Sequence, residues 1–118
     1  MASRSLRLRP WLKADLMHLV QLFLPLFDND GRALPHALFS DVREDLVARF
    51  GGLTAFSQAP AEGLWKDNDD VPSRDRIVIF EVMCDVVERE WWTNYRKSLE
   101  ERFKQEELVI RTWRLDLL

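Results

Sequence analysis

The order of the apolar segments constrains the fold of this chain more than any other feature. Four short strand-like runs are interspersed with two longer segments in which apolar residues recur at helical spacing. In chain order, the segments are Leu16–Leu26 (strand), a helix beginning near Pro35 and closed by Gly51-Gly52, Leu53–Gln58 (strand), Arg76–Cys84 (strand), Val86–Gln105 (helix) and Leu108–Leu115 (strand). Because the spacing of apolar residues is the main signal of secondary structure, the predicted order is βαββαβ.

This order is typical of the ferredoxin-like α+β fold. We expect a four-stranded antiparallel or mixed sheet with strand order 4-1-3-2 and two helices on one face. The opposite face of such a sheet is not covered by the chain's own helices. A function would therefore have to use this open face.

Both predicted helices are one-sided. Phe39, Val42, Leu46 and Phe50 form the apolar side of the first, and the Gly51-Gly52 pair supplies a left-handed cap. The second helix presents an apolar stripe, and its predicted start is a capping box with Asp85 as N-cap and Glu88 three residues later. The stripe consists of Trp92, Tyr95, Leu99 and Phe103. Trp91 lies beside this stripe and is either a core-edge residue or an aromatic anchor at a subunit interface.

Length and charge limit the domain organisation and the partners. The 118 residues suit one domain over residues 15–118, preceded by a flexible basic arm over residues 1–14. The first 13 residues hold four basic and no acidic side chains, which leaves 13 basic against 20 acidic residues in the rest. An acidic body repels a polyanion, so we expect no nucleic-acid binding. No run approaches the ~18 apolar residues of a membrane span, and we expect a cytoplasmic protein.

The sequence offers no known catalytic or metal motif. Cys84 is the single cysteine and lies in an apolar run, which favours a buried, inert thiol. The Asp28-Asn29-Asp30-Gly31 segment resembles a fragment of a calcium-binding loop, but the other ligands of such a loop are absent, so we interpret it as a solvated turn. We therefore predict no metal and no cofactor.

Alternation within the strands assigns side chains to the two faces of the sheet. In Arg76–Cys84, one face carries Val78, Phe80, Val82 and Cys84, and the other carries Ile77, Ile79, Glu81 and Met83. Glu81 is the anomaly, because a carboxylate in such a strand must be solvated, paired or protonated. Glu81 is therefore the candidate catalytic residue.

The first and last strands repeat this pattern. Gln21 shares a face with Met17, Leu19 and Phe23, whereas Arg111 shares a face with Val109 and Trp113. With strand order 4-1-3-2, Arg111, Gln21 and Glu81 would form a polar row on the open face. One hypothesis is that Glu81 and Arg111 satisfy each other or water at a dimer seam. The other is a half-polar pocket, in which Glu81 acts as base or hydrogen-bond acceptor and Gln21, Arg111, Trp113 and Met83 bind a ligand.

Three pieces of the chain resemble a family of short bacterial proteins without an established activity. The pieces are Phe50–Phe56, Ala59–Trp65 and Val78–Met83. This family is similar to the dimeric α+β barrels, so the resemblance implies a ferredoxin-like homodimer whose open faces enclose a cavity. Glu62 and Trp65 would then line the cavity mouth, and the alternative for Trp65 is a packing role.

Two function classes remain open. The first is a dimeric interaction protein, or a protein that binds a small apolar ligand at the open face. The alternative is a dimeric α+β barrel enzyme of the cofactor-independent oxygenase or isomerase type, acting on an apolar or aromatic metabolite. The first is favoured, because an apolar open sheet face needs to be covered and the sequence shows no catalytic constellation.

Overall fold

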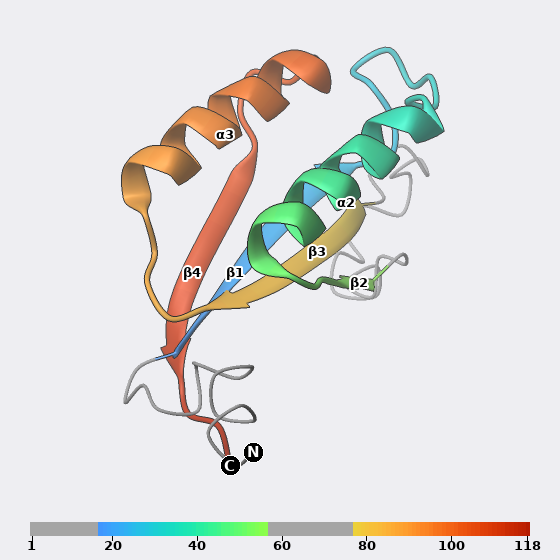
Figure 1. Cartoon of the computed structure of the whole chain (residues 1–118). Coiled ribbons are helices and arrows are strands. Elements are labelled where there is room, and N and C mark those ends of the chain that lie inside the picture. Colours follow the sequence, from blue (N-terminus) through green and yellow to red (C-terminus); the bar gives the residue numbers. More distant parts are fainter. Residues whose placement is uncertain (1–16, 57–76) are drawn as a thin grey trace, which may run out of the picture.

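The computed structural model describes residues 17–56 and 77–118, which form one four-stranded antiparallel sheet and two helices (Figure 1). In chain order, the elements are β1 (Met17–Pro25), α2 (His36–Phe50), β2 (Thr54–Phe56), β3 (Ile77–Cys84), α3 (Arg89–Arg102) and β4 (Val109–Leu115). The strands lie in the order β2-β3-β1-β4. This is the predicted order 4-1-3-2 counted from the other edge, so the predicted topology is confirmed, with every strand pair antiparallel.

Two predicted features lie outside the described residues. One is the basic arm over residues 1–14. The other is the segment that contains Glu62 and Trp65. The strand predicted over Leu53–Gln58 is described as far as Phe56 and begins at Thr54.

The core lies between the helices and one face of the sheet. The sheet contributes Val20, Leu22, Leu24, Val78, Phe80 and Val82, and the helices contribute Phe39, Val42, Leu46, Trp92, Tyr95 and Leu99. Every second residue of β1 and β3 is thus buried under α2 and α3, which lie on the same side of the sheet (Figure 1). Burial of these apolar side chains is the main stabilising contribution to the fold.

Helix α2 starts and stops where its sequence predicts. Pro35 is the N-cap residue with φ −60° and extended backbone, and Gly51 ends the helix with φ 83°. At that positive φ only glycine is unstrained, and its N–H donates to the carbonyl of Val47, as in a left-handed C-cap.

Helix α3 begins three residues later than predicted, and the predicted capping box is wrong. The N-cap residue is Glu88 instead of Asp85, and its side chain makes no capping hydrogen bond. The Glu88 carboxylate pairs with Arg49 of α2 instead. Val87 packs against the core, which holds the preceding turn in a non-helical path.

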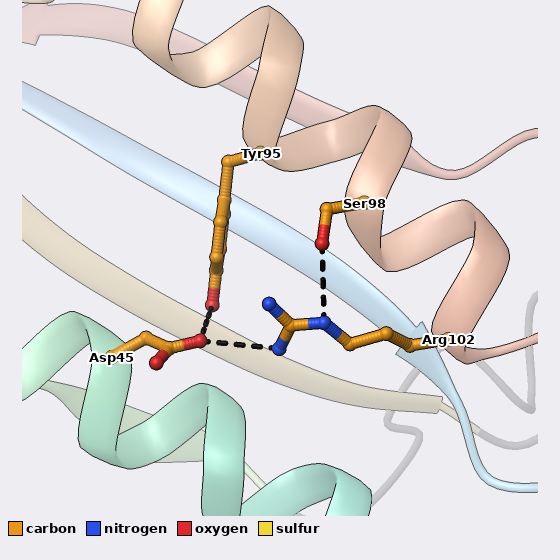
Figure 2. Close-up of polar contacts among 4 residues, drawn as sticks. All are labelled: Asp45, Tyr95, Ser98 and Arg102. Carbon is orange, nitrogen blue, oxygen red and sulfur yellow. Dashed lines mark hydrogen bonds and ion pairs between the residues drawn. The ribbon is translucent and has the colours of Figure 1, made fainter.

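Polar side chains also join the two helices (Figure 2). The Tyr95 hydroxyl donates to Asp45 Oδ2 at 2.9 Å, and Arg102 Nη1 donates to the same oxygen at 3.1 Å. Arg102 Nε donates to Ser98 Oγ at 3.1 Å. Burial, and then the hydrogen bond to Asp45, raise the pKa of Tyr95 well above its usual range. Tyr95 is therefore neutral at physiological pH and serves as a donor between the helices.

Candidate functional site

A row of hydrogen-bonded polar side chains crosses the open face of the sheet. Pairing places Gln21 of β1 opposite Glu81 of β3 on one side and opposite Arg111 of β4 on the other. Gln21 Nε2 donates to Glu81 Oε2 at 2.7 Å, and Arg111 Nε donates to Gln21 Oε1 at 2.8 Å. The structure thus brings together three residues that the sequence selected as site candidates, although their catalytic and ligand-binding roles stay predictions.

Gln21 is the central member of this row. Its side chain is buried, with 9% of its surface exposed, and both ends of its amide are used. Glu81 and Arg111 are therefore bridged by Gln21 and are not paired directly with each other. A buried amide is costly without partners, so the two charged neighbours hold Gln21 in one orientation.

Apolar rows lie on both sides of the polar row. On one side, Phe23 of β1 is flanked by Ile79 of β3 and Val109 of β4. On the other side, Leu19 of β1 is flanked by Met83 and Trp113. The open face is therefore apolar except for its central row.

Four of the exposed large apolar side chains lie on this face. Their exposed fractions are Phe56 46%, Met83 45%, Val109 55% and Trp113 41%. The face also holds Arg111 in place, since its guanidinium lies 4.9 Å from the ring centre of Phe23 and 5.6 Å from that of Trp113. Aromatic rings attract a cation over their faces, which favours one position of the charge.

Two residues of the open face are not among those predicted from the sequence. Thr54 of β2 lies opposite Glu81 and extends the polar row, and Phe56 lies opposite Ile79 and extends an apolar row. Alternation along the strand places Thr54 and Phe56 on the same face. It does not say which residues of β3 they lie opposite, because a three-residue edge strand has too few side chains to fix its register.

Several other candidates lie away from the open face. His18 has the opposite parity to Gln21 on β1, and its buried Nδ1 has no hydrogen-bond partner among the residues that the structure describes. Trp91 stacks on Tyr95 with ring centres 4.8 Å apart, and Arg49 lies over its ring at 4.2 Å. Because Trp91 is half-buried among side chains of its own chain, its core-edge interpretation is supported.

Two hollows border the helices. A shallow groove of about 430 Å³ between α2 and α3 is lined by Asp45, Ala48, Arg49, Trp91, Tyr95 and Arg102. A smaller hollow of about 140 Å³ lies between α3 and β4, where Arg89, Trp92, Thr93, Arg96 and Thr112 contribute. In the groove, Arg49 and Arg102 are already paired with Glu88 and Asp45.

The thiol of Cys84 is half-buried at the end of β3 and packs against the core. Burial, and then the negative charges of Asp85 and Glu88, raise the pKa of this thiol.

We expect iodoacetamide to alkylate Cys84 of the native protein at pH 8 more slowly than it alkylates the urea-unfolded chain, because less thiolate is present in the native protein. At pH values where the thiol of the unfolded chain is already fully ionised, the alkylation rate of the native protein should still increase with pH. Equal rates in both states at pH 8 would contradict this.

Within residues 17–56 and 77–118, no group of three or more His, Cys, Asp or Glu side chains is placed to hold a metal ion. The turn after β1 uses its carboxylate locally, since Asp28 Oδ1 accepts from the N–H groups of Asp30 and Arg32. None of the described helices is long and apolar enough to cross a membrane.

No family model matches the chain, and no curated protein matches it either. The resemblance to short bacterial proteins therefore stays a prediction. The α+β topology is shown by the structure alone.

Proposed function

We propose that this protein is a ferredoxin-like dimeric interaction protein, in which two copies pack by their open sheet faces. The observation that supports the proposal is the composition of that face: one hydrogen-bonded polar row between two apolar rows. Exposed Trp, Phe and Met side chains are typical of the centres of protein interfaces.

A second copy of the chain is the occupant that best fits this face. The row carries a carboxylate at Glu81 and a guanidinium at Arg111, on opposite sides of Gln21. A face with one charge of each sign is complementary to itself. Two such faces together would cover the apolar rows without leaving a net charge between the sheets.

Sedimentation velocity of the full chain over the micromolar range tests the proposal. A concentration-dependent dimer is the expected result. A chain that sediments as a monomer throughout this range would contradict the proposal. Native mass spectrometry of protein from its own host adds a second readout, because it would also detect a small apolar ligand retained between the sheets.

A small-ligand pocket with catalysis at Glu81 is the second candidate. The observation that favours it is the fixed orientation of the Glu81 carboxylate, whose Oε2 accepts a hydrogen bond from Gln21. A base held in one orientation beside an apolar surface suits proton abstraction from an apolar or aromatic metabolite. Gln21, Met83, Arg111 and Trp113 would contact that ligand.

Replacement of Glu81 by glutamine distinguishes this second candidate. Glutamine keeps the size of the side chain and removes the base, so turnover of a ligand identified by mass spectrometry should fall by about 100- to 10,000-fold. Glu90→Gln, on the exposed surface of α3, is the matched control. Undiminished turnover in Glu81→Gln would exclude the base role.

A further inference from the structure

The polar row has a direction across the sheet. From β2 to β4 it reads Thr54, Glu81, Gln21 and Arg111, so the negative charge lies on one side of β1 and the positive charge on the other. Among the described residues, the ion pairs Arg49–Glu88, Arg96–Glu100 and Arg102–Asp45 leave both Glu81 and Arg111 without an ion-pair partner.

A two-fold dimer brings the same patch of both copies together. When two sheets pack face to face, the axis lies in the plane between them, and it can run along the strands or across them. An axis across the strands would place Glu81 over the partner's Glu81 and Arg111 over the partner's Arg111. An axis along the strands reverses the row and places opposite charges over each other.

We propose that the two sheets meet about a two-fold axis that runs along β1 and passes over Gln21, so that Glu81 of each copy binds the partner's Arg111. This inference rests on the proposed dimer. Sheets in aligned packings lie about 10 Å apart with strand directions within about 30°, which two extended side chains can span. Each dimer then has two identical ion pairs.

The apolar rows agree with this axis. Reversal of the rows places Met83 over the partner's Trp113, and Ile79 over the partner's Val109. Met83, Trp113 and Val109 are three of the exposed apolar side chains of the face. Thioether and indole groups pack favourably against each other. Leu19 and Phe23 of β1 would lie over their own counterparts, close to the axis.

Charge reversal tests the axis. Glu81→Arg alone and Arg111→Glu alone each turn two attractions into two repulsions, and we expect the dimer dissociation constant to rise by about 100-fold or more. The double variant Glu81→Arg/Arg111→Glu exchanges the charges and restores both pairs. Its dissociation constant should return to within about tenfold of the original. The Gln21 amide can turn over to serve the exchanged neighbours.

Mixing the two single variants tests that the two polar rows face each other, whichever way the axis runs. The Glu81→Arg variant carries two positive charges in its row, and the Arg111→Glu variant carries two negative charges. Two copies of the same variant therefore repel each other. In a mixed dimer both contacts join opposite charges, and heterodimers should therefore dominate in native mass spectra. Matched controls are Arg114→Glu and Glu90→Arg, which change the net charge equally but lie away from the row. Circular dichroism verifies that each variant folds.

The outcomes separate this inference from the proposed dimer. A monomeric wild-type chain would overturn the dimer itself. A wild-type dimer whose dissociation constant is unchanged by both single reversals would overturn the axis alone, because like charges would then already face each other. Loss of the dimer in both single variants without recovery in the double variant would also overturn the reciprocal pairing.

Discussion

If the chain forms the proposed dimer, Trp113→Ala is expected to convert it into a folded monomer at micromolar concentration. Trp113 is 41% exposed in the single chain and lies on the open face opposite Leu19. A large aromatic side chain near the centre of an interface contributes about 2 to 4 kcal/mol to binding. The dissociation constant should therefore rise by about 30- to 1,000-fold, measured by sedimentation velocity.

Val86→Ala is the matched control for Trp113→Ala. Val86 is the more exposed of the two at 63%, but it lies in the turn before α3 and not on the open face. We expect it to leave the dissociation constant unchanged within a factor of about two, as is usual for surface sites without a structural role. An equal effect of both substitutions would indicate that the interface lies elsewhere.

The open face and its polar row could be predicted because they depend on two simple regularities. Side chains alternate along a strand, so Gln21, Glu81 and Arg111 had to share a face with the residues two positions away. The βαββαβ order then made β1 the neighbour of both β3 and β4. Because no long-range detail enters either step, the sequence alone was sufficient.

Other features depend on contacts between distant segments and could not be predicted. Helix α3 starts at Arg89 because Val87 is drawn to the core and Glu88 pairs with Arg49 of α2. Local capping preferences would have placed the start at Asp85. Similarly, the hydrogen bonds of Asp45 to Tyr95 and Arg102 join two helices about 50 residues apart in sequence. Only the packing of α2 beside α3 makes these partners neighbours.

The position of Gln21 between Glu81 and Arg111 supports the proposed association through the polar row. A neutral amide between a carboxylate and a guanidinium separates the two charges, so they cannot neutralise each other within one chain. Two apolar residues at Glu81 and Arg111 would suit a buried sheet face at lower desolvation cost. Charges kept apart in this way suit a partner that presents the opposite order, so in the proposed dimer they would specify how the two copies are oriented.

Phe103→Ala is expected to lower the free energy of unfolding by about 3 to 5 kcal/mol. Phe103 is fully buried at the end of α3, and its ring packs edge-to-face against Phe39 of α2 with ring centres 5.3 Å apart. Removal of the Phe103 ring leaves a cavity under both helices. Phe56→Ala is the matched control, because it also removes a phenyl ring, but from a side chain on the open face that is 46% exposed. Urea denaturation below the dimer dissociation constant should therefore give a loss of less than about 1 kcal/mol for Phe56→Ala. Because a dimer adds stability in proportion to its affinity, the difference between the two variants should narrow at high protein concentration. A larger loss for Phe56→Ala than for Phe103→Ala at low concentration would contradict the division of this molecule into a helix-covered core and an open sheet face that contributes little to the stability of the single chain.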